Sequence, residues 1–247
     1  MDLSFLQFMM MGFVAQFIDG ALGMAYGVTA MTFLLSAGVP PVVASASVHS
    51  SEVATTLASG LSHLAIGNID KQLFRRLIIP GMAGAITGAY VLSVATVAYL
   101  EIVIAMYLGI MGAIIFWKGL RKLPQFSRSK AHIRTLGFAG GFFDTAGGGG
   151  WGSIVSSTLL AKGHVPCAAV GTVSMAEFFV ALSASATFFL TIGIFYWKIV
   201  LGLLSGGLIA APLAAYSCRK IPPRILMLAA GLLVMGLSLR TLYLSLP

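Results

Sequence analysis

The feature of this sequence that most restricts its fold is an internal repeat with an offset of 125 residues. The register holds without a gap from Gly12 to Gly81. The matched pairs are Gly12/Gly137, Phe13/Phe138, Phe17/Phe142, Asp19/Asp144, Ala21/Ala146, Gly23/Gly148, Gly27/Gly152, Gly38/Gly163, Pro41/Pro166, Ala44/Ala169, Glu52/Glu177 and Gly81/Gly206. In an apolar chain, two matching copies of a glycine-interrupted hydrophobic pattern are typical of membrane transporters.

The composition requires a membrane environment. Of the 247 residues, 58% are hydrophobic and 9% are charged, whereas a soluble domain has about 25% charged residues. The net charge of +8 does not indicate nucleic-acid binding, because the basic residues lie in short loops between apolar segments. Cys167 and Cys218 are unrelated by the repeat and form no CxxC motif, so we interpret them as packing residues.

The apolar segments divide each half into five. They are Leu3–Ile18, Met24–Ala37, Val42–Ile66, Phe74–Val97 and Leu100–Trp117, then Ile133–Phe143, Ser153–Ala161, Val165–Ile192, Lys198–Cys218 and Arg224–Leu246. The first two segments of each half are too short for a full span of about 20 residues. Glycine-rich stretches, Gly20–Gly27 and Thr145–Gly152, join each short pair. Each pair forms either a re-entrant hairpin or two short, steeply packed helices.

Charge predicts the orientation. Lys and Arg collect on the cytoplasmic side of membrane proteins. If each half crosses the membrane an odd number of times, thirteen of the fifteen basic residues lie inside and only Lys198 and Arg240 lie outside. The basic loop also changes sides between the halves. We therefore predict an all-α polytopic membrane protein of two inverted repeats, residues 1–118 and 133–247, with a basic cytoplasmic linker at 119–132 and both termini outside.

The glycine-rich breaks predict a binding site. Non-helical backbone at membrane depth must face protein or a water-filled cavity. The N-termini of the following helices, from Met24 and Ser153, would carry partial positive charge that suits an anion. The polar third segment of each half would line the same cavity. The predicted binding residues are Gly20, Gly23, Met24, Ser45, His49, Thr145, Gly148, Gly149, Gly150, Trp151, Ser153 and Ser174.

Four acids lie within the apolar segments or beside the breaks. Asp19 and Asp144 precede the breaks, where they would either cap a helix or hold a proton or cation. Glu52 and Glu177 are deeper, and an intramembrane charge is a functional candidate by default. They would either couple transport to protons or form a fixed hydrogen bond between helices. Acids beside an anion would have to be protonated or paired with His49 or a cation.

Enzyme and metal chemistry are not expected. His49 and Glu52 form an H-x-x-E pair, but the repeat replaces His49 by Ser174, and no second cluster of metal ligands is apparent in the sequence. We therefore expect no metal, no cofactor and no catalytic residues. The absence of a nucleotide-binding P-loop argues against ATP-driven transport by this chain alone.

These motifs resemble those of a known family. An Asp followed by a glycine-rich turn in both halves, a G-x-x-P turn at Gly38–Pro41 and Gly163–Pro166, and the polar helix behind it are similar to the sulfite exporter TauE/SafE family. The resemblance implies a secondary carrier that moves a small sulfur-containing anion, sulfite or an organosulfonate such as sulfoacetate, across the inner membrane by alternating access, often outward. An anion channel of the same fold, or a carrier for another small organic anion, is the alternative. The lipid bilayer, protons or a cation, and a second copy in a homodimer are the expected partners.

Overall fold

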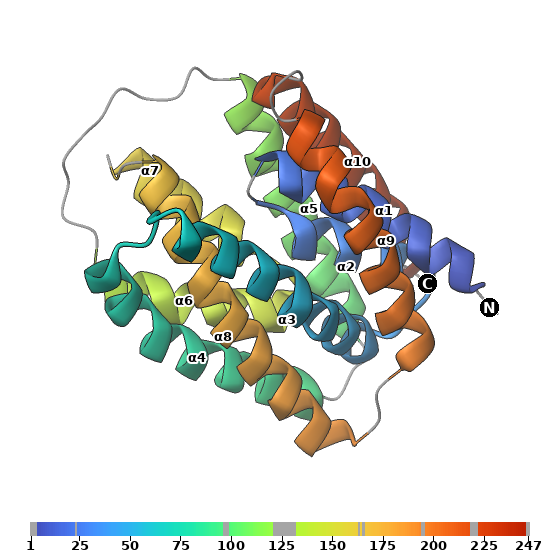
Figure 1. The fold of residues 1–247 in the computed structure, drawn as a ribbon. Helices are drawn as coiled ribbons and strands as arrows, with labels where there is room; N and C mark the ends of the chain where they lie inside the picture. Colours follow the sequence, from blue (N-terminus) through green and yellow to red (C-terminus); the bar gives the residue numbers. More distant parts are fainter. Residues whose placement is uncertain are drawn as a thin grey trace.

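The part of the chain that the structure describes is helical, with ten α-helices and one π-helical turn (Figure 1). The computed structural model describes residues 4–22, 24–95, 99–120, 132–162, 164, 166–193, 196–217 and 222–245. The elements are α1 (Phe5–Leu22), α2 (Tyr26–Ser36), α3 (Pro41–Ala65), α4 (Lys71–Val94), α5 (Leu100–Leu120), α6 (Ile133–Gly147), η1 (Gly152–Ser156), α7 (Ser157–Ala161), α8 (Pro166–Ile192), α9 (Trp197–Ser217) and α10 (Pro223–Ser245). No strand occurs in these ranges, so the predicted all-α class is confirmed.

The ten predicted apolar segments correspond to the helices, with η1 and α7 together forming the seventh. The C-terminal ends of two helices differ from the prediction, because α1 and α6 each continue four residues beyond the predicted apolar segment. Small residues continue a helix without steric cost, and α6 stops only at Gly148, whose φ of 77° is the left-handed conformation that commonly ends helices. Asp19 and Asp144 therefore lie in the last turns of α1 and α6, and the non-helical breaks are shorter than predicted.

The helices that follow the two breaks are half-helices. Among the described helices, α4, α5, α8 and α10 are long and apolar enough to cross a membrane. By contrast, α2 has 11 residues, and η1 and α7 have five each. At about 1.5 Å per residue, each half-helix covers about 16 Å, roughly half of the hydrocarbon core. Both begin inside the protein, since Tyr26 is 4% exposed and Trp151 is 0% exposed.

The two halves of the chain interlock. The most extensive helix contacts are α1 with α9, α4 with α6, α5 with α10 and α3 with α8, and each joins the first half to the second (Figure 1). Under the repeat, α1 corresponds to α6 and α9 to α4, so the first two contacts are counterparts of each other. Such a pair of equivalent contacts between the halves is expected when two repeats are related by a twofold axis. The inverted orientation and the repeat boundaries stay predictions, and residues 121–131 of the predicted linker lie outside the described residues.

Glycines let the counterpart helices pack closely. A Cβ at Gly206 in α9 would overlap the carbonyl oxygen of Met9 in α1, and one at Gly84 in α4 would overlap that of Phe138 in α6. Lipid supplies no hydrophobic force between helices, so small residues that allow close backbone approach stabilise such contacts instead. Gly81, the counterpart of Gly206, makes room for the indole of Trp151. The matched glycines at 81 and 206 therefore have a packing role.

The predicted topology can be tested by labelling. In a variant without Cys167 and Cys218, single cysteines replace Ser4, at the start of the described chain, and Ser127, in the predicted cytoplasmic linker. A membrane-impermeant thiol reagent added to intact cells should label the cysteine at position 4 and reach the one at position 127 only after the membrane is opened. Labelling of both positions from the same side would contradict the inverted topology.

Candidate functional site

The two breaks meet at the centre of the molecule. The Cα of Gly149, in the second break, lies so close to the backbone of Gly27 and Val28 that a Cβ at this position would overlap both. The hydroxyl of Tyr107 in α5 donates to the carbonyl of Gly149 at 2.9 Å. The sequence predicted that these glycines admit a ligand close to the backbone. At Gly149 the close neighbour is the first turn of α2, at Gly27 and Val28, and the ligand contact stays a prediction. The breaks of both halves thus form one structural unit.

Each break is capped by the acid before it. The N–H of Tyr26 donates to Asp19 Oδ1 at 3.3 Å, and the N–H of Trp151 donates to Asp144 Oδ1 at 2.8 Å. Both bonds span seven residues and are equivalent under the repeat. A carboxylate of the chain therefore lies at each half-helix N-terminus, where the sequence predicted a bound anion. These bonds agree with the capping role of the two acids, while a role in coupling stays a prediction.

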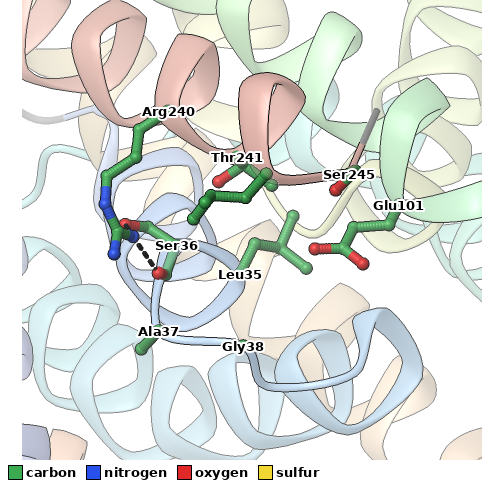
Figure 2. Close-up of a pocket in the computed structure, with 9 residues that line it drawn as sticks. Leu35, Ser36, Ala37, Gly38, Glu101, Arg240, Thr241 and Ser245 are labelled. Carbon is green, nitrogen blue, oxygen red and sulfur yellow. Dashed lines mark hydrogen bonds between the residues drawn. The ribbon is translucent and has the colours of Figure 1, made fainter. Parts of the chain in front are cut away.

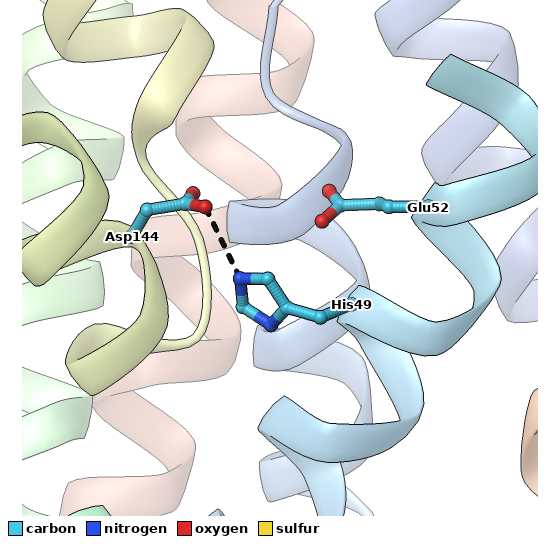
Figure 3. A group of neighbouring side chains, drawn as sticks. All are labelled: His49, Glu52 and Asp144. Carbon is cyan, nitrogen blue, oxygen red and sulfur yellow. Dashed lines mark hydrogen bonds and ion pairs between the residues drawn. The ribbon is translucent and has the colours of Figure 1, made fainter. Parts of the chain in front are cut away.

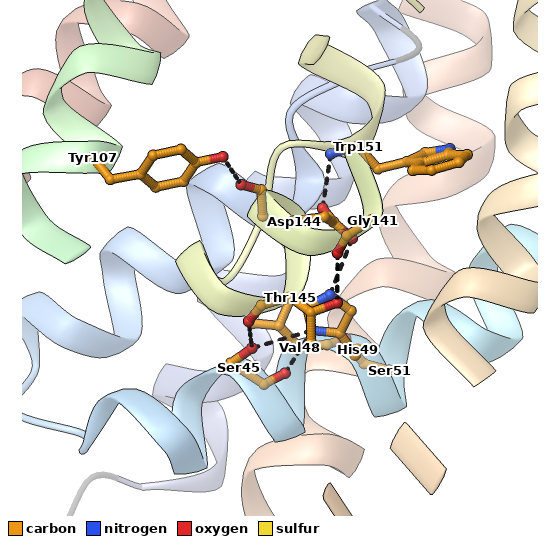
Figure 4. A network of polar contacts seen from close by, with 10 residues as sticks. Ser45, Val48, His49, Ser51, Tyr107, Gly141, Asp144, Thr145 and Trp151 are labelled. Atoms are coloured by element: carbon orange, nitrogen blue, oxygen red, sulfur yellow. Dashed lines mark hydrogen bonds and ion pairs between the residues drawn. The ribbon is translucent and has the colours of Figure 1, made fainter. Parts of the chain in front are cut away.

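His49 connects the third helix to the second break (Figure 4). Its Nδ1 lies 2.8 Å from the carbonyl oxygen of Ser45, and its Nε2 lies 3.1 Å from Asp144 Oδ2. Since a carbonyl only accepts, Nδ1 carries a hydrogen, and a further proton must lie between Nε2 and the carboxylate. The hydroxyl of Ser45 donates to the carbonyl of Thr145 at 2.8 Å. A buried polar network thus joins α3 of the first half to α6 of the second.

The four predicted acids converge on this network. Glu52 interacts electrostatically with Asp144, Glu177 and Asp19, and Glu177 interacts with both aspartates. His49 is the only basic partner in an ion pair with any of them among the described residues. No ion pair joins a lysine or an arginine of the described chain to any of these acids. The centre is therefore strongly acidic for a site inside a membrane.

The structure also brings together a set of potential metal ligands that the sequence did not predict. One ligand atom each from His49, Glu52 and Asp144 lies within 4.8 Å of the other two, and all three residues are buried (Figure 3). The H-x-x-E pair seemed incomplete in the sequence because Asp144 lies on another helix, in the other half of the chain. The sequence pattern therefore did not reveal this cluster, and the expectation that the chain binds no metal stays a prediction.

The remaining predicted binding residues have varied positions. Thr145 donates to the carbonyl of Gly141 at 3.0 Å within α6. The indole of Trp151 donates to the carbonyl of Val173 at 3.2 Å, which indicates packing rather than a pore lining. Ser174, the counterpart of His49, is half-buried on α8. Gly20 lies in α1, and Met24 is buried. Gly148 lies beside Met31, and Gly150 lies beside Tyr107. Gly23 lies outside the described residues.

Sequence reasoning missed three residues near the breaks, Tyr107, Lys118 and Thr29, whereas Ser153 was among the predicted binding residues. Tyr107 lies in a uniformly apolar segment, and nothing in its neighbourhood marks it. Lys118, treated only as a topology signal, donates to the carbonyl of Ser153 at 3.3 Å. The hydroxyls of Thr29 and Ser153 are buried without a hydrogen-bond partner among the described residues. The repeat counterpart of Ser153 is Val28, and Thr29 is the next residue along the chain. This near match is the signal that could have identified Thr29.

A cavity lies at the C-terminal end of α2 (Figure 2). It measures about 180 Å³. The guanidinium of Arg240 donates to the carbonyl of Ser36 and, at 2.9 Å, to its hydroxyl, so the cation stabilises the C-terminus of α2. The lining residues are Leu35, Ser36, Ala37, Gly38, Glu101, Arg240, Thr241, Leu244 and Ser245. Helix α2 therefore runs from the central breaks to this cavity.

The contact between the breaks predicts a steric effect on stability. Gly149 has a φ of +153° and no room for a Cβ, whereas Gly38 has a φ of +79° and nothing within 4 Å of a Cβ. Gly38→Ala should cost about 1 kcal/mol for the backbone conformation alone. Gly149→Ala should cost roughly 1–3 kcal/mol more because of the overlap. Thermal unfolding in detergent measures both, and equal losses would contradict the close contact.

Ala25 predicts a stabilising substitution. It has a φ of 93°, the one positive φ at a non-glycine among the described residues, and its counterpart is Gly150. An alanine in this conformation costs roughly 1–2 kcal/mol, so Ala25→Gly should raise the free energy of unfolding by about that amount. Ala30→Gly, within the same half-helix, should lower it by about 1 kcal/mol. Destabilisation by both substitutions would contradict the strain at Ala25.

Comparisons with known proteins agree with this architecture. Residues 8–241 match the family described as "Sulfite exporter TauE/SafE". The chain is 41% identical over 247 residues to "Probable membrane transporter protein YtnM" of Bacillus subtilis (strain 168), with 95% of this chain and 81% of that protein covered. No solved structure matches. A family match over nearly the whole chain, together with apolar helices and paired breaks, shows that this membrane transport protein belongs to the sulfite exporter TauE/SafE family.

Proposed function

We propose that the protein is a secondary carrier that moves a small sulfur-containing anion, sulfite or an organosulfonate such as sulfoacetate, across the inner membrane by alternating access, in the outward direction. The matched family's description refers to sulfite export, and the relative's name refers to membrane transport. The fold supports a carrier because interlocked repeats with broken helices at their interface are typical of secondary transporters.

The observation that carries this proposal is the pair of unpartnered hydroxyls at the half-helix N-termini. Thr29 and Ser153 each lie in the first turn of a half-helix, and their exposed fractions are 0% and 2%. Buried hydroxyls are normally hydrogen-bonded, so an unpartnered one calls for a specific explanation. A sulfonate has three oxygens that share one negative charge, and two hydroxyls at positive helix ends are suitable donors for it. The ligand of this proposal therefore bridges the two half-helices.

The half-helices also suggest how access alternates. α2 extends from the central breaks to the cavity beside Arg240. In the other half of the chain, η1 follows the second break, and Lys118 contacts it at Ser153. In this proposal, each half-helix controls one entrance, and the contact between Gly27 and Gly149 moves as the two halves rock. Arg240 attracts anions at the outer entrance, and Lys118, which contacts Ser153, attracts them toward the start of the second half-helix. The homodimer expected from the sequence belongs to the same proposal.

Counterflow in proteoliposomes tests the transported species. Vesicles that contain the protein and unlabelled sulfite or sulfoacetate should take up the labelled anion in a saturable manner, and unlabelled external anion should compete. A flux that rises linearly with concentration and shows no counterflow would indicate a channel instead. Absence of flux for every sulfur-containing anion, with saturable flux of a carboxylate, would overturn the substrate class.

Variants of the hydroxyls test the binding site. Ser153→Ala and Thr29→Val should each weaken the anion-induced rise in melting temperature, with affinity reduced roughly tenfold, because each removes one donor to a charged group. Ser238→Ala is the matched control, since this hydroxyl is also buried without a partner in the described chain but lies on α10. An equal response of all three variants would contradict the proposed site.

A further inference from the structure

The proposed anion and the acidic centre present an electrostatic conflict. Four carboxyl groups and one imidazole lie where the two halves meet, and no described lysine or arginine pairs with them. Inside a membrane, uncompensated charges of one sign are costly, so each acid must bind a proton or a cation. An anion at the same place adds to the cost. The acids of the centre therefore need bound protons or a bound cation, and a cation would also favour the binding of an anion.

Three ligand atoms lie around one point in this centre. Figure 3 shows the carboxyl groups of Glu52 and Asp144 facing each other, with the imidazole of His49 beside the space between them. His49 Nε2 and Asp144 Oδ2 are 3.1 Å apart, and the Glu52 oxygen lies within 4.8 Å of both. A metal ion about 2.1 Å from each atom requires separations of roughly 3–3.5 Å. The His49–Asp144 pair already meets this requirement, and a shift of about 1 Å would bring Glu52 within it.

Neighbouring groups hold two of these ligands in place. The carbonyl of Ser45 accepts from His49 Nδ1, so Nε2 is the nitrogen that faces Asp144. The N–H of Trp151 binds Asp144 Oδ1 and leaves Oδ2 directed into the centre. Metal-binding histidines almost always donate their other N–H to a carbonyl or carboxylate, and ligating carboxylates are themselves hydrogen-bonded. The surroundings of both ligands thus match those of metal ligands in known sites.

Glu52 supplies an independent observation that points to a ligand. Its Oε2 is buried without a hydrogen-bond partner among the described residues, and the residue is only 3% exposed. A buried carboxylate oxygen without a partner is costly, and such a group calls for an ordered water, an ion or a functional role. A cation between Glu52, His49 and Asp144 would satisfy this oxygen and offset two negative charges at once.

We propose that His49, Glu52 and Asp144 bind one divalent transition-metal cation at the interface of the two halves. One imidazole nitrogen and two carboxylate oxygens suit Mn²⁺, Fe²⁺, Co²⁺ or Zn²⁺, whereas Ca²⁺ and Mg²⁺ prefer oxygen ligands alone. The cation takes the place of the proton between His49 and Asp144. With three protein ligands, the cation keeps a position open for a further ligand, as in catalytic zinc sites.

This site would also explain how an acidic centre binds an anion, and that step rests on the proposed function. A sulfite or sulfonate oxygen can occupy the open position on the cation while the hydroxyls of Thr29 and Ser153 bind its other oxygens. The first half supplies His49 and Glu52, and the second supplies Asp144. Rocking of one half against the other would therefore change the geometry of the cation site, and the metal would link anion binding to the movement of the two halves.

Metal binding to the purified protein tests the proposal without any transport assay. The full chain, without an affinity tag and stripped with a chelator, is titrated with Mn²⁺, Co²⁺ and Zn²⁺, and bound metal is measured by equilibrium dialysis. We expect one metal per chain for at least one of these ions. His49→Gln and Asp144→Asn should each weaken binding by more than the roughly 10–100-fold that loss of an outer hydrogen bond costs. For Co²⁺, the visible absorption spectrum should also change in both variants.

Asp19→Asn is the matched control. Asp19 is the repeat counterpart of Asp144 and caps Tyr26 in the same way, but it is not one of the three ligands. This variant should keep one metal per chain with an affinity within a few-fold of the parent. Failure of the parent to bind any of the three ions, or loss of binding in Asp19→Asn equal to that in Asp144→Asn, would overturn the proposal. A centre that binds only protons or sodium would also overturn the proposal.

The same samples separate this inference from the proposed function. Metal binding that depends on His49, without any rise in melting temperature on addition of sulfite or sulfoacetate, would support the metal site and contradict the sulfur-containing substrate. An anion response that persists after chelation, in a protein that binds no metal, would support the anion carrier and contradict the metal site.

Discussion

Backbone that leaves the helical path inside a membrane must find its hydrogen-bond partners within the protein. The chain has two such breaks, and the rest of the architecture satisfies this requirement. Asp19 and Asp144 accept the N–H groups that open the half-helices, and Tyr107 binds the carbonyl of Gly149. The breaks also pack against each other, which is possible only because the helices of one half are inserted among those of the other. The interlocked fold is thus a consequence of placing irregular backbone at the centre.

The same constraint gathers charge where water is scarce. The capping acids bring two carboxylates to the half-helix N-termini, and Glu52 and Glu177 add two more from α3 and α8. Helix dipoles and peptide N–H groups offset part of this charge. The remaining charge must be neutralised by bound protons or by a bound cation.

The repeat is structural, but the chemistry of the centre is not symmetric. His49 has Ser174 as its counterpart, Gly150 has Ala25, and Lys118 has Tyr243. Asp144 both caps a half-helix and pairs with His49, whereas Asp19 has no such partner among the described ion pairs. If the two halves exchange roles during alternating access, the outward-facing and inward-facing centres therefore present different ligands. Such a difference would let one state bind a substrate more tightly than the other.

Much of the fold follows from the sequence. Apolar segment lengths and glycine positions predicted the helices to within a few residues, because hydrophobic periodicity and helix breaking are local properties. The repeat predicted which acids and glycines occupy equivalent places. It did not predict that α1 and α6 continue past their apolar patterns, since small residues are compatible with both helix and turn. Residues such as Tyr107, in an apolar segment without polar neighbours, carried no local signal of a role.

The sequence by itself determined that this chain is an all-helical membrane protein with two equivalent breaks and intramembrane acids, because composition, periodicity and the repeat can be read from the chain alone. Only the tertiary structure decided which of these groups meet. The contact of His49 with Asp144 spans 95 residues, and that of Gly149 with Gly27 joins the second break to the start of α2. Such contacts arise from side-chain packing between distant helices, which local sequence patterns do not specify.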